Sequence, residues 1–322
     1  MQTLAAAFWP GRLPIHRATD RRVHLPDGDI LAVHDDCPLD WQPGGRVVVL
    51  GHGLNGCHRS PVIARLADKL SQRGVRVFRF DMRGCGAGAG LARRPYHAGR
   101  SDDLSEVIHA ILGWCGSGPN DPPGLRIGPP PSIVLIGVSL SGNILLKYLG
   151  ENPDRVPSAV VRAIAVNPPI DLARSVAALR GPLNRWYDRH FATSLCKHVA
   201  DHVRRMPDAP VPAIPMSPRR MAEFDDWYTA PMSGYATGAD YYQQCSAAQF
   251  IPRIEVPTVV LTSSDDPMVP VGIFEAEQSS WPTAVRLAII QGGGHLGYIA
   301  KPGIDPDVHW LDWRMMELAM AG

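Results

Sequence analysis

The sequence has no excess of charge of either sign. Its 322 residues include 32 Lys and Arg against 31 Asp and Glu, which leaves a formal net charge of +1. A domain that binds nucleic acid, or docks on an anionic membrane, usually has a clear basic excess. The balanced charge therefore gives no support for either kind of partner.

Paired cysteines are also absent. The six cysteines stand singly along the chain, without any C-x-x-C pair. Such scattered residues are typical of reduced thiols in a cytosolic protein and not of a disulfide framework. They are Cys37, Cys57, Cys85, Cys115, Cys196 and Cys245.

Long apolar runs are missing as well. No stretch approaches the roughly 20 apolar residues that a membrane span requires. The apolar residues 4–9 are too few for a signal peptide, lack a basic lead and end at Pro10. We therefore expect a soluble, cytoplasmic protein with no integral membrane segment.

What is present favours a single α/β domain over residues 1–322. Apolar residues make up 45% of the chain, which is enough for a sizeable core. Residues 22–34 are typical of a hairpin with a Pro-Asp-Gly-Asp turn, and strands then alternate with helices. This alternation predicts a mainly parallel, eight-stranded sheet with helices on both faces. The later strands are expected at 46–50, 75–80, 133–136, 162–166, 257–264 and 284–290, and helices at 60–73 and 101–114.

A serine among small residues follows one of these strands. Residues 137–142 are Gly-Val-Ser-Leu-Ser-Gly, between the apolar run 133–136 and a helical stretch. A strand, a tight turn with a central serine and a helix form the context of a nucleophile elbow. The turn strains Ser139 so that its hydroxyl stands clear of the sheet, and small neighbours let the two backbones approach closely. Ser141 replaces the second glycine of the usual G-x-S-x-G pattern.

An acid and a histidine follow in the order that this chemistry requires. Asp266 comes after the strand 257–264, and His295 comes after the strand 284–290, behind three consecutive glycines. The chain order Ser, Asp, His is that of the α/β-hydrolase fold and differs from other serine-hydrolase folds. The pattern predicts Ser139 as nucleophile, His295 as base and Asp266 as the acid that orients it.

The acid has two other candidates. Asp265 could take the role if the loop is turned by one residue, and Asp171 follows the strand 162–166, where some hydrolases of this fold carry the acid. An aspartate in a loop can also stabilise a turn by accepting a hydrogen bond from its own backbone. This structural role would explain the two aspartates that do not serve as the catalytic acid. We prefer Asp266, which directly precedes Pro267.

An oxyanion hole has a candidate loop. Residues 51–56, Gly-His-Gly-Leu-Asn-Gly, follow the strand 46–50, and glycine lets this backbone pass close to a substrate. We expect the backbone amides of Leu54 and Leu140 to face the developing oxyanion.

Residues 172–250 interrupt the alternation of strands and helices. The stretch is too long for a simple connection, and its pattern is helical in pieces, broken by prolines over 207–218. An insertion between the strands near 162–166 and 257–264 would lie above Ser139, so we expect a helical cap. Most of its aromatic residues are expected to fill the small core of the cap.

Short motifs along nearly the whole chain are shared with a known group. They lie at residues 1–4, 25–29, 52–56, 83–85, 96–103, 223–226, 240–242, 265–267 and 293–297. In these motifs the chain resembles the YheT-like α/β-hydrolases, the branch that includes plant embryogenesis-associated hydrolases. The resemblance implies a serine nucleophile at Ser139 and hydrolysis of carboxylic esters.

The resulting hypothesis is a serine esterase that cleaves short- to medium-chain acyl esters through an acyl-enzyme, with no metal or organic cofactor. Its partner would be a small ester or lipid-like substrate. The alternatives are an acyltransferase or a lipid or thioester hydrolase that uses the same serine, and last a non-catalytic binding module.

Two histidine patterns offer other chemistry. His97 and Asp102 match an H-x4-D pattern proposed for acyl transfer, but Asp102 could instead cap the helix 101–114. His198 and His202 have the i, i+4 spacing of a zinc pair. Because no third ligand is evident, a solvated helix face is the favoured interpretation of this pair.

Overall fold

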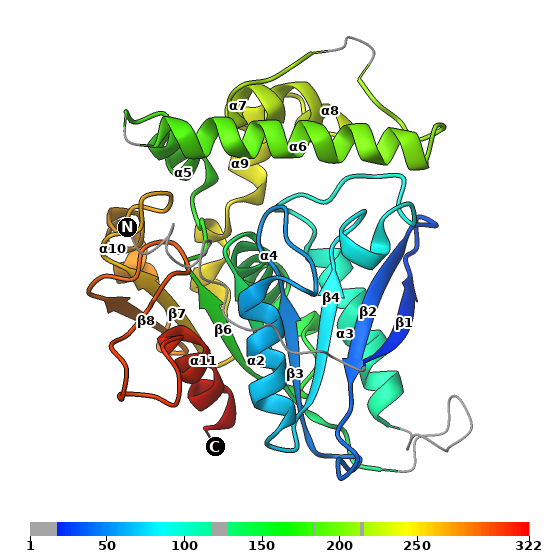
Figure 1. Cartoon of the computed structure of the whole chain (residues 1–322), viewed down its shortest axis with the longest axis vertical. Helices are drawn as coiled ribbons and strands as arrows, with labels where there is room; N and C mark the ends of the chain where they lie inside the picture. Colours follow the sequence, from blue (N-terminus) through cyan, green and yellow to red (C-terminus); the bar gives the residue numbers. More distant parts are fainter. Residues whose placement is uncertain (1–17, 117–127, 183, 213–215, 322) are drawn as a thin grey trace.

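The computed structural model describes residues 18–116, 128–182, 184–212 and 216–321. The apolar stretch 4–9, the motif at 1–4 and most of the glycine- and proline-rich stretch 116–131 lie outside the described residues. The sheet has eight strands in the order β1-β2-β4-β3-β5-β6-β7-β8 (Figure 1). The expected mainly parallel, eight-stranded α/β architecture is therefore confirmed.

The first two strands form the predicted hairpin and run antiparallel to their neighbours. β1 pairs with β2, and β2 pairs antiparallel with β4. All later neighbours pair in parallel, so the carboxyl ends of six strands meet at one edge of the sheet. The strands are β1 (Thr19–His24), β2 (Ile30–Asp36), β3 (Arg46–Gly51), β4 (Arg76–Asp81), β5 (Ser132–Val138), β6 (Val160–Val166), β7 (Thr258–Ser263) and β8 (Val285–Ile290).

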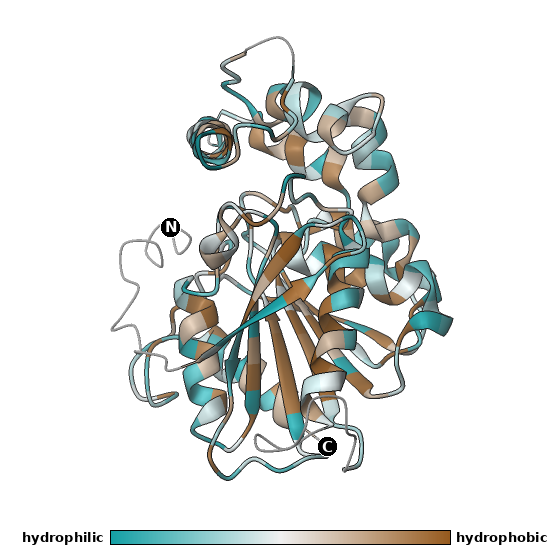
Figure 2. Cartoon of the chain, turned by 90° about the vertical axis from the view of Figure 1, so that its right-hand side faces the viewer, coloured by the Kyte–Doolittle hydropathy of each residue, from teal (hydrophilic) through white to brown (hydrophobic). Residues whose placement is uncertain are grey.

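Helices cover both faces because the central strands are apolar on both sides. In β3, Val48 and Leu50 pack on the face covered by α2 (Pro61–Ser71) and α11 (Trp310–Met320). Val47 and Val49 alternate to the other face, covered by α3 (Ser101–Cys115) and α4 (Leu140–Glu151). Figure 2 shows the consequence, since the strands are mostly hydrophobic while the outer helices carry polar residues.

The residues between β6 and β7 form a separate helical layer, which we call the upper helical segment (residues 172–250, apart from 183 and 213–215). Figure 1 shows this layer over the carboxyl edge of the sheet, with the long α6 running across it. The layer contains α5 (Leu172–Leu179), α6 (Arg185–Arg205), α7 (Met221–Phe224), the π-helix η3 (Asp225–Thr229), α8 (Ala230–Met232), α9 (Gly238–Cys245) and η4 (Ala247–Gln249).

Shorter elements complete the chain. They are η1 (Gly86–Gly88), η2 (Pro153–Arg155), η5 (Ile251–Arg253), α10 (Gly272–Glu277) and η6 (Gln278–Ser280). Among the helices of the described residues, none combines the length and the apolar character that crossing a membrane demands.

One glycine of α4 makes a close backbone contact that fixes this helix. A Cβ at Gly150 would overlap the carbonyl oxygen of Phe250. We expect Gly150→Ala to lower the free energy of unfolding by about 3 kcal/mol or more, the upper end of overpacking penalties, because backbone atoms must move. Chemical denaturation of the variant measures the loss.

Gly113→Ala is the matched control. Gly113 lies in α3 with no atom within 4 Å of an added Cβ, so alanine should be neutral or stabilise by about 1 kcal/mol through helix propensity. Equal stability changes in the two variants would contradict the close approach of α4 to Phe250.

Candidate active site

Ser139 occupies a strained turn between β5 and α4. Its backbone has φ 51° and ψ −117°, a left-handed region that a side chain rarely adopts. The turn is held on both sides: the Ser139 amide donates to Val166 O at 2.8 Å, and its carbonyl accepts from the Gly142 amide at 2.8 Å. The sharp turn predicted from the sequence is therefore present.

Small residues around the serine are a steric requirement. A Cβ at Gly137 would lie 2.5 Å from the carbonyl oxygen of Ser141, and one at Gly142 would lie 3.0 Å from Pro168 Cβ. Ser141 fits in place of the usual glycine because Gly51 opposite has no side chain. Its hydroxyl donates to His52 O at 2.5 Å, so the serine adds a bond between the first turn of α4 and the loop after β3.

A hydrogen-bonded chain joins Ser139, His295 and Asp266. His295 Nε2 lies 2.9 Å from Ser139 Oγ, and His295 Nδ1 lies 2.8 Å from Asp266 Oδ2. The loop that carries His295 begins with Gly292, Gly293 and Gly294, which all have positive φ. The ring of Tyr298 packs where a side chain at Gly293 would stand, so glycine is required there. The structure thus brings together the three side chains that the sequence singled out.

Asp266 is held as an acceptor. Its Oδ1 accepts from the Met268 amide at 2.8 Å and the Val269 amide at 3.1 Å, while Oδ2 also accepts from Asn167 Nδ2 at 2.6 Å. Burial opposes ionisation, but the charge of His295 and these hydrogen bonds hold the pKa of Asp266 below its usual range. The carboxylate is therefore ionised at neutral pH and oriented toward the imidazole.

Asn167 was missed in the sequence analysis. It follows β6 directly, has φ 46° and accepts from Tyr298 Oη at 2.7 Å while it donates to Asp266. A polar residue at the carboxyl end of a parallel strand was the available signal. Asn167 links the β6 end to the loops that carry Asp266 and His295.

The other two candidate acids have different partners. Asp265 Oδ1 accepts from the Gly294 amide at 2.7 Å and from Ser263 Oγ at 3.0 Å, so it braces the loop before His295. Asp171 caps α5 by accepting from the Arg174 amide at 2.9 Å. Among the three, Asp266 is the one that the described contacts place against His295.

The loop after β3 lies beside Ser139. Leu54 and Leu140 line the same cavity as Ser139 and His295. Leu140 is the first residue of α4, where backbone amides have no partner within the helix. A Cβ at Gly53 would lie 3.3 Å from Ser139 Cβ, which shows how closely the loop approaches the serine.

His52 and Tyr96 fix the conformation of this loop. The Met82 amide donates to His52 Nε2 at 3.1 Å, and His52 Nδ1 lies 2.8 Å from Gly53 O. Burial lowers the pKa of His52, so the ring stays neutral and its Nδ1 is the donor to that carbonyl. Asn55 has a positive φ of 57°, and its amide donates to Tyr96 Oη at 3.3 Å.

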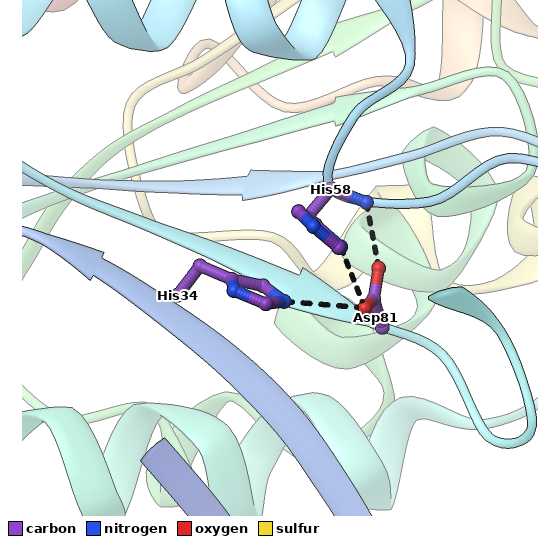
Figure 3. A group of neighbouring side chains, drawn as sticks. All are labelled: His34, His58 and Asp81. Atoms are coloured by element: carbon purple, nitrogen blue, oxygen red, sulfur yellow. Dashed lines mark hydrogen bonds and ion pairs between the residues drawn. The ribbon is translucent and has the colours of Figure 1, made fainter. Parts of the chain in front are cut away.

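Farther along the same loop, His58 belongs to a buried cluster with His34 of β2 and Asp81 at the end of β4 (Figure 3). His58 Nδ1 is 2.8 Å and His34 Nε2 is 3.3 Å from Asp81 Oδ2, and the His58 amide donates to Asp81 Oδ1 at 2.6 Å. Burial favours the protonated acid, yet the two imidazoles hold the pKa of Asp81 below its usual range. The donor types suit a metal, but each of these atoms already bonds within the cluster, which ties the loop to β2 and β4.

A cavity of about 140 Å³ lies between Ser139 and the upper helical segment. Its walls are mostly apolar, from α5, α6, the π-helix and the loop after Asp266. His198 and His202 also line it, so the interpretation of this pair as a solvated helix face is wrong. His202 is only 7% exposed, because the face of α6 that carries both histidines turns toward the sheet.

His97 and Asp102 are not brought together. His97 is buried, where burial holds its pKa well below the usual value, and it lines the cavity beside the rings of Tyr235 and Tyr241. Asp102 is exposed in the first turn of α3. The expectation that Asp102 caps this helix is also wrong, because Arg100 stands at the cap position without a side-chain bond.

Asp225 is a further cavity residue that the sequence analysis noted only within a motif. It begins the π-helix, is 5% exposed and accepts from Thr229 Oγ1 and Tyr242 Oη, each at 2.7 Å. Burial raises the pKa of Asp225 to about 6, although the two hydroxyl donors oppose this shift. Sequence periodicity carries no signal for a π-helix, which is a common feature of functional sites.

Comparisons with known proteins agree with this fold. The family described as alpha/beta hydrolase fold matches residues 46–302. The YheT protein of Escherichia coli (strain K12) is 30% identical over 92% of this chain and 82% of its own. The monoacylglycerol lipase of Saccharomyces cerevisiae is 25% identical over 82% of this chain and 57% of its own. The crystal structure of the alpha/beta hydrolase GrgF from Penicillium sp. sh18 superposes with a TM-score of 0.57 at 19% identity, covering 94% of this chain and 97% of that one.

Proposed function

Because this chain belongs to the YheT-like branch of the alpha/beta hydrolase family, we propose that it is a serine esterase that cleaves carboxylic esters. One observation carries the proposal: Ser139, on a strained turn at the floor of an apolar cavity, is hydrogen-bonded to His295, which is bonded in turn to Asp266. A nucleophile, its base and the acid that orients the base are what acyl transfer through a serine requires.

The distances support an acyl-transfer mechanism. His295 Nε2 removes the proton from Ser139 Oγ as the oxygen attacks the ester carbonyl, and the imidazolium then protonates the departing alcohol. The Asp266 carboxylate stabilises the imidazolium without taking its proton. A water molecule then attacks the acyl-enzyme in the same way and releases the acid, so no step needs a metal or an organic cofactor.

The developing oxyanion needs donors that are already in place. The proposed donors are the backbone amides of Leu54 and Leu140, one on the loop fixed by His52 and one at the start of α4. Loss of a single such donor in other enzymes costs a factor of about 10² to 10³ in rate. The rigid bonding of both segments supports this assignment, because an oxyanion hole works only if its geometry is preorganised.

The cavity supports the proposed substrate class. In the proposal the upper helical segment is a cap, and its apolar residues receive a short- to medium-chain acyl group. The lipase name of the yeast relative is consistent with an apolar acyl chain. A cytoplasmic location is part of the same proposal, supported by six cysteines that are all free thiols.

The first test is the hydrolysis of p-nitrophenyl esters from acetyl to palmitoyl by the wild type and by Ser139→Ala. We expect the highest kcat/KM at short to medium chains and a loss of about 10⁴-fold or more in the variant, because the nucleophile is removed. Ser141→Ala is the matched control, since its hydroxyl bonds a backbone carbonyl and not His295. Equal rates for wild type and Ser139→Ala would refute the proposed nucleophile.

A second pair of variants separates the two adjacent acids. Asp266→Asn should lower kcat about 10⁴-fold, because an amide cannot hold the imidazole in the required tautomer. Asp265→Asn should cost less than about tenfold, since Asp265 bonds the Gly294 amide and Ser263 and not the imidazole. Steady-state kinetics on one p-nitrophenyl ester compares them. A larger loss in Asp265→Asn would assign the acid to Asp265.

A further inference from the structure

The cavity under α6 has two chemically different arms. Phe191, Leu195, His198 and His202 lie on one face of α6 at spacings of four, three and four residues, and all line the cavity. The eleven helical steps from Phe191 to His202 span about 16 Å along the helix axis. The face is apolar in its first half and carries both histidines in its second half.

The first half of α6 lies over the carboxyl end of β7. Asn184, directly before α6, donates to Pro267 O at 2.6 Å, next to Asp266. Around this half the cavity wall is formed by apolar side chains of α5 and by Met268 and Val269. We call this part the apolar arm.

The second half of α6 lies over the carboxyl end of β4. The His198 ring packs edge-on against Tyr96 at 5.6 Å between centroids, and its Nε2 would lie 3.4 Å from a Cβ at Gly84. β5 lies between β4 and β7 in the sheet order, separated from them by β3 and β6. Ser139 therefore stands between the apolar arm and a second part of the cavity, which we call the histidine arm.

One polar atom in the histidine arm, His202 Nε2, makes no hydrogen bond within the described part of the chain. His202 is 7% exposed, and its Nε2 is buried with no hydrogen-bond partner in the described part of the chain. A buried polar atom without a partner costs about 1–3 kcal/mol, which a ligand group that bonds to it would recover. Because His202 lines the cavity, the substrate is the natural source of such a group.

The charges nearby favour an uncharged ligand group over an anion. Both arginines that line the cavity face carboxylates: Arg83 is neutralised by Asp27, Asp29 and Asp103 at 2.7, 2.5 and 2.6 Å, and Arg94 lies 3.6 Å from Asp27. Burial lowers the pKa of His198, so this ring adds no positive charge at neutral pH. A hydroxyl, which can donate to or accept from an imidazole nitrogen, satisfies His202 without burying a new charge.

We propose that the histidine arm binds the alcohol portion of the ester and that His202 recognises a free hydroxyl on it. The substrate class is then an ester of an apolar acyl chain with an alcohol that carries at least one further hydroxyl. The acyl chain occupies the apolar arm, and the scissile carbonyl lies over Ser139 between the two. This inference rests on the proposed function, since it assigns the two sides of the ester that Ser139 cleaves.

The test uses two esters of nearly equal shape, 2-hydroxyethyl octanoate and propyl octanoate, with kcat/KM corrected for their rates of alkaline hydrolysis. We expect the wild type to prefer the hydroxyl ester about tenfold or more, because a site that bonds a hydroxyl discriminates against an analogue without it. His202→Phe should bring the ratio close to one, and His202→Gln, which restores a polar atom, should regain part of it. His190→Phe, an exposed residue of the same helix, should keep the wild-type ratio.

A ratio near one in the wild type, or an unchanged ratio in His202→Phe, would overturn the inference. Its failure is separable from that of the proposed function, because p-nitrophenyl octanoate reports on Ser139 without a hydroxyl in the leaving group. If no ester is hydrolysed, the test is the affinity of Ser139→Ala for each of the two octanoates, measured by calorimetry. Tighter binding of the hydroxyl ester that is lost with His202→Phe supports the histidine arm, and equal binding refutes it.

Discussion

The close approach of β5, α4 and the loop after β3 is the constraint on which the rest of the site depends. A side chain at Gly137 would collide with the backbone of Ser141, one at Gly142 would press on Pro168, and one at Gly51 would collide with the Ser141 side chain. Within this close packing Ser139 adopts φ 51°. Strain of this kind costs of order 1–3 kcal/mol and persists only when the surroundings hold it. Here the bonds to Val166 and Gly142 hold it, so Ser139 Oγ points away from the sheet toward His295.

The loops that carry His295, Asp266 and Leu54 are held by hydrogen bonds around this turn. Asp265 and Tyr298 hold the glycine-rich loop of His295, and Asn167 connects Tyr298 with Asp266. On the other side, Ser141 bonds the carbonyl of His52, whose ring fixes the loop that carries Leu54. The nucleophile, the base and the candidate oxyanion donors therefore share one rigid frame at the carboxyl edge of a parallel sheet, where open α/β sheets bind their ligands.

Local sequence patterns predicted much of this structure. Apolar runs predicted the strands, and Ser139, Asp266 and His295 stood out because each directly follows a strand, with glycines or a proline beside it. The pattern could not reveal Asn167, whose role depends on contacts with residues 99 and 131 positions away in the chain. The same limit explains His198 and His202: i, i+4 spacing fixes their common face on α6 but not what that face covers. The π-helix at Asp225 has no sequence period of its own and could only be found in three dimensions.

The central claim is that one strained serine, and no other, is activated as a nucleophile. The most direct test is to treat the folded protein with a fluorophosphonate and to locate the adduct by peptide mass spectrometry. We predict one equivalent of adduct, on Ser139, with none on Ser141 two residues away. An adduct on another serine, or no adduct on protein that circular dichroism shows to be folded, would contradict it.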